Sequence, residues 1–168
     1  MRAGRVFVAV RVTAADFAPA VGFPAAPREI LCALIGRSVE RELQDLNRNM
    51  IVFDLLLGSG ALFAPSQTLA ILGHDKPSPD AEHLFRRCGP IWLTFAAAHL
   101  VAHKRGSSRD WWALAWLRGT ELLTDVVWAR SGSFSRPGAK AGMYLAGAAN
   151  LGMALGFANL ARNGGTKR

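Results

Sequence analysis

The sequence predicts an all-α integral membrane protein, a four-helix bundle preceded by an amphipathic helix. Three observations carry this prediction. First, 51% of the 168 residues are hydrophobic and only 19% are charged, whereas about a quarter of the residues in a soluble domain are usually charged. Second, the apolar residues gather in long segments, and about 20 such residues form a helix that crosses a bilayer. Third, lysine and arginine residues flank these segments, as in membrane proteins.

The chain divides into four parts by composition. Residues 1–27 contain three prolines after Thr13, which predicts a poorly ordered extension. Residues 28–49 have apolar side chains at helical spacing, which predicts an amphipathic helix beside the membrane. Residues 50–161 are the predicted bundle, and residues 162–168 are a tail. The four spans are expected at about 50–72, 86–103, 111–129 and 141–161. Whether residues 1–49 belong to the folded unit is left open.

The distribution of cations predicts the location and orientation of the protein. The net charge of +8 lies mostly at segment ends and not on one soluble element, which favours anionic lipid over nucleic acid as the partner. The short loops require neighbouring spans to be antiparallel. With the amino end inside, more lysines and arginines lie on the inner side. We therefore expect a multi-pass protein of the cell membrane with both termini cytoplasmic.

The third span carries an unusual stripe of charge. Arg118, Glu121 and Asp125 are spaced by three and four residues and so share one helical face. In a bilayer such a face has to point into protein, and it is a functional hypothesis by default. A small soluble domain would simply expose it to water.

The depth of each polar residue in its span predicts its partners, at a rise of about 1.5 Å per residue. Arg118 is expected to meet Asp54 and His99. Glu121 is expected beside Asn150 near the midplane, and Asp125 near Tyr144 and the 66–68 segment. The predicted polar interior is therefore Asp54, His99, Arg118, Glu121, Asp125 and Asn150.

Two interpretations of this interior remain open. Arg118 and the carboxylates can form internal ion pairs that fix helix packing. Alternatively, they can form a ligand site or a proton-transfer site, in which Glu121, Asp125 and His99 are the catalytic candidates, because a buried acid can act as a general acid or base.

Other motifs give weaker predictions. His99 and His103 have a spacing that can bind a metal, but His103 begins a basic boundary, so we predict no metal site and no cofactor. Gly152 and Gly156 allow close helix approach, with packing inside the chain favoured over a second helix-bearing partner. The tryptophans near the span ends, including Trp92 and Trp111, are expected in an interfacial belt. Pro65 is expected to kink the first span.

The segment Gly58-Ser-Gly-Ala-Leu-Phe-Ala-Pro65 and the acidic third span resemble the small DoxX-like membrane proteins, over about residues 50–161. This resemblance implies a four-helix membrane bundle, with accessory roles in redox or quinone-related membrane systems in some members. The chain is more remotely similar to membrane bundles of the sterol-isomerase type, which implies histidine and acidic residues in an intramembrane cavity. His99, Glu121, Asp125 and Asn150 are the residues here that match those types.

The predicted function is that of a non-catalytic accessory protein or a bundle that binds a small lipophilic molecule. The alternative is an intramembrane enzyme that performs acid/base chemistry on a lipophilic substrate, with Glu121 or Asp125 as acid/base and Arg118 as electrostatic partner. A small transporter is less favoured, because one four-span unit lacks paired broken helices.

Overall fold

The computed structural model describes residues 25–131 and 134–163, and this part of the chain is helical, with no strand. The prediction of an all-α fold is confirmed. The predicted poorly ordered extension, up to residue 24, and most of the predicted tail lie outside the described residues. The chain divides into two compact units, Met1–Ser38 and Val39–Arg168, and the packing described below belongs to the second. The helices are α1 Ala25–Phe63, α2 Pro65–Ile71, α3 Pro79–Arg86, α4 Gly89–Arg105, α5 Ser108–Ser131 and α6 Pro137–Arg162.

The first helix is longer than the sequence suggested. A separate amphipathic helix over 28–49 and a span beginning at residue 50 were expected, but α1 runs through this boundary without a break. Residues 37–57 contain neither glycine nor proline, so nothing in this stretch interrupts the backbone hydrogen bonds of the helix. Asn47 is fully buried, so the folded unit includes residues that precede Met50.

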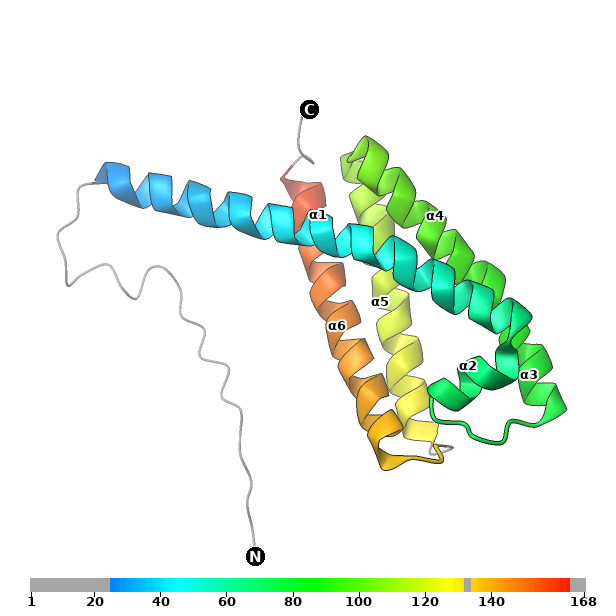
Figure 1. Cartoon of the computed structure of the whole chain (residues 1–168). Coiled ribbons are helices and arrows are strands. Elements are labelled where there is room, and N and C mark those ends of the chain that lie inside the picture. Colours follow the sequence, from blue (N-terminus) through cyan, green and yellow to red (C-terminus); the bar gives the residue numbers. More distant parts are fainter. Residues whose placement is uncertain (1–24, 132–133, 164–168) are drawn as a thin grey trace, which may run out of the picture. The chain divides into compact units, whose positions relative to one another are not determined.

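Pro65 ends the first helix and begins the next one, where the sequence predicted a kink inside one span over 50–72. Ala64 has φ −140° and ψ 55°, outside the helical region, and Pro65 opens α2. Proline fits the first turn of a helix because its missing N–H would have no partner there. Figure 1 shows α2 turning away from the axis of α1. The predicted first span is therefore two helices.

The polar connection predicted over 74–87 contains a short helix, α3. Ser78 caps it, since its Oγ accepts from the backbone N–H of Ala81 at 3.2 Å, and Asp80 and Glu82 lie in its first turn. Both features stabilise a helix start. The hydrophobic pattern missed α3 because the cap and the charges specify it, and its apolar face contributes only Phe85 to the core.

The remaining helices agree with the predicted spans to within a few residues. Helices α5 and α6 pack closely along their length, and α4 packs on α5 (Figure 1). Gly106, with φ 60°, ends α4 in the left-handed conformation that glycine adopts without strain. The Ser108 hydroxyl donates to the Ala161 carbonyl at 2.6 Å and ties the start of α5 to the end of α6.

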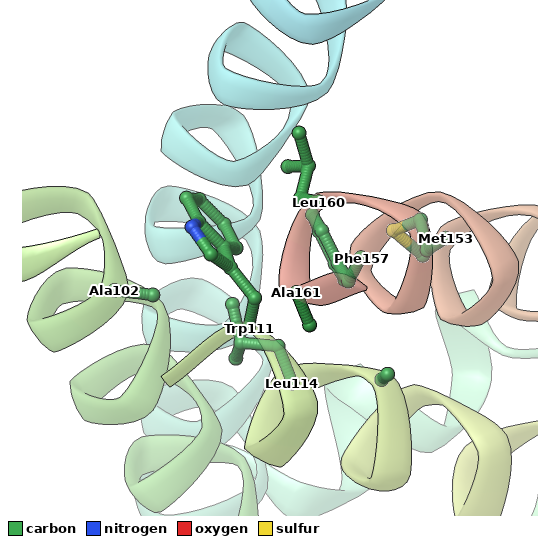
Figure 2. Packing of buried hydrophobic residues seen from close by; sticks show 8 residues of the cluster. Ala102, Trp111, Leu114, Met153, Phe157, Leu160 and Ala161 are labelled. Atoms are coloured by element: carbon green, nitrogen blue, oxygen red, sulfur yellow. The ribbon is translucent and has the colours of Figure 1, made fainter. Parts of the chain in front are cut away.

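One apolar core lies where α4, α5 and α6 meet the part of α1 around Leu43. Trp111 stacks on Phe157 with ring centroids 5.6 Å apart, and Leu114 and Met153 complete the packing (Figure 2). Trp111 and Trp92 are both buried, so the prediction that they lie in an interfacial belt is wrong. Each ring fills a space between helices, which removes more apolar area from solvent than an interfacial position would.

Glycines allow several close helix contacts, and one of them involves the predicted pair. A Cβ on Gly156 would lie 2.5 Å from Leu43 Cδ2, whereas one on Gly152 would meet nothing within 4 Å. The two glycines therefore do not form one packing seam inside this chain. A Cβ on Gly58 would lie 2.9 Å from the Gly89 carbonyl oxygen, so Gly58 and Gly89 are the pair that lets the backbones of α1 and α4 approach.

One described helix, Gly138–Arg162, is long and apolar enough to cross a membrane by length and composition. Helix α4 has 17 residues, which is about 26 Å at the helical rise. Helix α5 is long enough but carries Arg118, Glu121 and Asp125 within its length. One possible membrane-spanning helix thus gives weak support for the predicted location in a membrane.

Candidate functional site

The buried polar side chains of the described residues come from four helices. They are Asn47 and Asp54 on α1, His99 on α4, Arg118 and Asp125 on α5, and Asn150 on α6. Glu121, also on α5, is partly buried. Every residue of the predicted polar interior therefore faces protein. Asn47 belongs to the same interior and was not predicted.

Arg118 is the centre of the first group of contacts. Its guanidinium forms an ion pair with Asp54 Oδ2 through Nη2, and its Nε donates to His99 Nε2 at 3.0 Å. The predicted meeting of Arg118 with Asp54 and His99 is confirmed. The guanidinium carbon also lies 5.5 Å from the centroid of the Phe95 ring, a favourable position for a cation.

These contacts fix the protonation of His99. A guanidinium can only donate hydrogen bonds, so His99 Nε2 has to be the accepting nitrogen. The ring proton then lies on Nδ1, which is 2.6 Å from Asn47 Oδ1 and donates to it. Asn47 returns a hydrogen bond from Nδ2 to the His99 carbonyl at 3.1 Å. We call Asn47, Asp54, His99 and Arg118 the arginine cluster.

The arginine cluster also uses the histidine for which the sequence raised the metal alternative. Both ring nitrogens of His99 have protein partners, which leaves neither for a metal ion. Within the described ranges, no three histidine, cysteine or acidic side chains are grouped so that they could hold a metal.

A second group lies farther along α5 and is more sparsely bonded. Asn150 Nδ2 donates to Asp125 Oδ2 at 2.8 Å, and the Trp92 indole N–H lies 3.5 Å from Glu121 Oε2, a long hydrogen bond. We call Trp92, Glu121, Asp125 and Asn150 the acid cluster. It joins α4, α5 and α6.

The acid cluster corrects the pairing predicted from depth. Glu121 was expected beside Asn150, and Asp125 beside Tyr144, but Asn150 bonds to Asp125 and Tyr144 is 44% exposed. Helical side chains lean toward the amino end of their own helix. In the antiparallel pair α5 and α6, Asp125 and Asn150 therefore lean toward each other. Depths calculated from the backbone alone did not include this displacement.

A cavity of about 340 Å³ lies beside both clusters. We call it the acid cavity. Its polar lining comprises Asp54, Trp92, Arg118, Glu121, Asp125 and Asn150, and its apolar lining includes Met50, Phe53, Leu57, Met143 and Met153. Five of the six predicted residues thus line one space, and His99 does not. The volume is at the lower end of the range of small-molecule sites.

Two buried oxygens at this cavity lack hydrogen-bond partners among the described residues. They are Asp54 Oδ1 and Asn150 Oδ1, and both residues line the acid cavity. Buried polar atoms are nearly always paired, and an unpaired one calls for an explanation. Both atoms are acceptors, so the site fits a ligand with hydrogen-bond donors.

Sequence reasoning missed Asn47 and Trp92 as parts of the site. Asn47 lies seven residues before Asp54, two helical turns away on the same face, a signal that the assumed boundary at residue 50 hid. Trp92 has no comparable signal, because a tryptophan near a span end fits an interfacial position equally well.

Comparisons with protein-family models, with curated proteins and with solved structures found no match. The site alone therefore carries the functional conclusion.

Proposed function

We propose that this protein is an integral membrane four-helix bundle that binds a small lipophilic molecule in the acid cavity. The observation that carries the proposal is the combination of buried charged side chains with widely exposed apolar ones. Among the described residues, six charged, amide or imidazole side chains are buried beside the apolar core, while many large apolar side chains are exposed along the helices. Soluble monomers rarely expose contiguous apolar patches above a few hundred Å², whereas lipid favours this distribution.

The apolar surface extends over α1, α4, α5 and α6. Leu56 is 69% exposed, Trp116 74% and Leu145 72%. The other strongly exposed apolar side chains on these four helices include Val52, Phe53, Phe63, Ile91, Leu123, Val127, Leu151 and Leu155. On α4, α5 and α6 these residues lie between charged residues at or beside the helix ends, as expected of a surface in contact with acyl chains.

Cations mark both ends of the proposed bundle. Lys104, Arg105 and Arg162 are exposed where α4 and α6 end, and Arg130 and Lys140 are exposed where α5 ends and α6 begins. Such positions allow lysine and arginine to reach headgroups. The proposed orientation places the α4–α5 turn and both termini in the cytoplasm.

The cavity lining defines the ligand class. Its walls are mainly apolar, and its polar lining residues include Asp54 and Asn150, each of which has one oxygen without a partner among the described residues. A molecule with an apolar body and a head that donates hydrogen bonds would satisfy both features. We therefore propose ligand binding without turnover as the principal role.

The binding proposal is tested with purified protein in phosphatidylcholine nanodiscs. We expect retention of 1-monododecanoylglycerol, which has a twelve-carbon chain and two hydroxyl groups, in native mass spectrometry. Replacing Ala149 with tryptophan should fill the cavity and abolish retention. Replacing Ala148, an exposed neighbour outside the cavity lining, with tryptophan is the matched control. Equal retention by both variants would contradict binding in this cavity.

Acid/base catalysis is the second candidate, because Glu121 and Asp125 lie one turn apart on α5 and both line the cavity. Two carboxyl groups beside one bound molecule could transfer a proton from one atom of it to another. If Glu121→Gln or Asp125→Asn abolished conversion of a lipophilic substrate while the fold survived, the enzyme interpretation would replace simple binding.

The resemblance to DoxX-like proteins also remains a proposal. It is supported by the segment from Gly58 to Pro65, in which Gly58 packs against α4 and Pro65 separates two helices. An accessory role in a membrane redox system would follow from that resemblance.

A further inference from the structure

A second and larger cavity, of about 820 Å³, lies beyond the acid cavity. We call it the vestibule. It is bounded by α2, α3, α4 and α5 and by the loops that follow α2 and α5. Its lining residues are Leu69, His74, Asp75, Lys76, Pro77, Ala81, Leu84, Phe85, Cys88, Trp92, Thr124, Trp128 and Ser135.

The vestibule and the acid cavity share the walls formed by Trp92 and Trp128. The indole N–H of Trp92 points to Glu121, while its ring packs edge-on against Phe85, with centroids 5.5 Å apart. Trp128 stacks on His74 with centroids 5.3 Å apart. These two tryptophans are thus the residues common to the linings of the two spaces.

The two spaces differ in chemistry. Carboxyl, amide and guanidinium groups gather in the acid cavity, whereas aromatic and aliphatic side chains dominate the vestibule. The charged residues of the vestibule, Asp75 and Lys76, are exposed in the loop after α2, and Asp75 is paired with Arg136. This gradient suits a molecule with a polar head and a long apolar body.

We infer that the acid cavity and the vestibule form one elongated site for a single-chain amphiphile. The head donates hydrogen bonds to Asp54 and Asn150, and the chain passes Trp92 and Trp128 into the vestibule. The inference rests on the proposed ligand-binding function and adds the shape of the ligand and the direction in which it lies. Both volumes fall within the range of small-molecule sites, and a compact ligand would occupy only the smaller one.

Cys88 provides a natural reporter, because it lines the vestibule and not the acid cavity. The experiment uses the full chain with Cys32, the other cysteine, replaced by serine, in phosphatidylcholine nanodiscs. The rate of Cys88 modification by a maleimide is measured with 1-monododecanoylglycerol, with methyl dodecanoate and with glycerol. The ester has the chain without hydroxyl groups, and glycerol has the hydroxyl groups without the chain.

The expected result is a saturable slowing by 1-monododecanoylglycerol alone, roughly tenfold when nine-tenths of the sites are occupied. Thr124→Trp, which fills the vestibule, should prevent binding of the chain. Leu123→Trp, at an exposed neighbour outside both linings, is the matched control and should retain it. Ala81→Cys, in a protein without Cys32 and Cys88, gives a second reporter on α3 and should be protected in the same way.

The failures of the two proposals are distinguishable. If native mass spectrometry shows bound 1-monododecanoylglycerol while both reporters, Cys88 and the Ala81→Cys variant, react at unchanged rates, the elongated site is wrong and binding in the acid cavity stands. If none of the three compounds is retained or protects either reporter, the proposed ligand-binding function fails, and the elongated site fails with it.

Discussion

The arginine cluster and the acid cluster lie in the same interior, yet they differ in how fully their polar atoms are paired. In the arginine cluster, His99 uses both ring nitrogens and Arg118 contacts two partners. In the acid cluster, Glu121 has one long hydrogen bond and Asp125 has one to Asn150. Within the described part of the chain, each cluster leaves one buried oxygen unpaired, Asp54 Oδ1 in the first and Asn150 Oδ1 in the second, but the first cluster has more hydrogen bonds between its own members.

This difference separates two roles that the sequence could not separate. A buried ionic network that joins α1, α4 and α5 specifies how these helices pack, because breaking it leaves a buried charge unpaired. An incompletely bonded group beside open space is available to a ligand. In the proposed function, the arginine cluster therefore serves helix packing and the acid cluster serves ligand recognition, with Asp54 contributing to both.

The largest expected effect is that of Arg118→Met. The variant removes the partner of Asp54 and leaves its carboxyl buried, which should lower the free energy of unfolding by about 3–5 kcal/mol. Thermal unfolding in detergent micelles measures the loss. The double variant with Asp54→Leu should recover most of it, and a single variant as stable as the natural protein would contradict the packing role.

Asn47→Leu should have the next largest effect. It leaves the Nδ1 proton of His99 without an acceptor, at a cost of about 1–3 kcal/mol. Asn49→Leu, on an exposed position of the same helix, is the control and should change stability little. In the natural protein, the ¹⁵N shifts of the His99 ring should report a neutral ring protonated on Nδ1. A spectrum of the opposite tautomer would contradict the proposed hydrogen bonds of His99.

Asp125→Asn and Glu121→Gln should have smaller effects on stability, within about 1 kcal/mol, because each keeps the shape and the accepting oxygen. Binding of 1-monododecanoylglycerol should weaken by about fivefold, or about 1 kcal/mol, because Glu121 and Asp125 line the cavity beside Asp54 and Asn150, which hold the head. Isothermal titration in nanodiscs measures the change in binding, and thermal unfolding in detergent micelles measures the change in stability. A loss of stability as large as that of Arg118→Met would erase the proposed division between the clusters.

The smallest effect concerns the loops that border the vestibule, where Arg136 holds the carboxyl of Asp75. The hydrogen bond from Arg136 lowers the pKa of Asp75 from its ordinary value of 3.8. The pair therefore stabilises the fold above pH 3.8, and this contribution is lost as the pH falls through the lower folded-state pKa. Arg136→Gln should be slightly less stable than the natural protein at neutral pH. If this difference in stability persisted in strong acid, the ion pair between Arg136 and Asp75 would not be its cause.

Several parts of the fold and the site followed from the sequence. The spacing of Arg118, Glu121 and Asp125 predicted a face that points into protein, and depth in the spans predicted the contacts of Arg118 with Asp54 and His99. These predictions succeeded because the helical rise and repeat are nearly constant.

Other features depended on information that a periodic pattern does not contain. Helix α3 is set by the Ser78 cap and local charges, and the direction in which side chains lean joins Asp125 to Asn150. The break at Pro65 could have been either a kink or a new helix, because proline is compatible with both. Neither cavity could be read from the sequence, since a cavity depends on how four helices diverge.

Contact between the apolar surface and lipid is tested most directly by cysteine accessibility in native membranes. Leu123, Leu145 and Leu155 are replaced one at a time with cysteine in a protein lacking Cys32 and Cys88, and Lys104 and Lys140 are the controls at the helix ends. If the bundle lies in the membrane, a water-soluble maleimide should label the two end positions and leave the three apolar positions unlabelled. The end position on the far side of the membrane should be labelled only after the membrane is opened. Equal labelling of all five positions in aqueous buffer would contradict it.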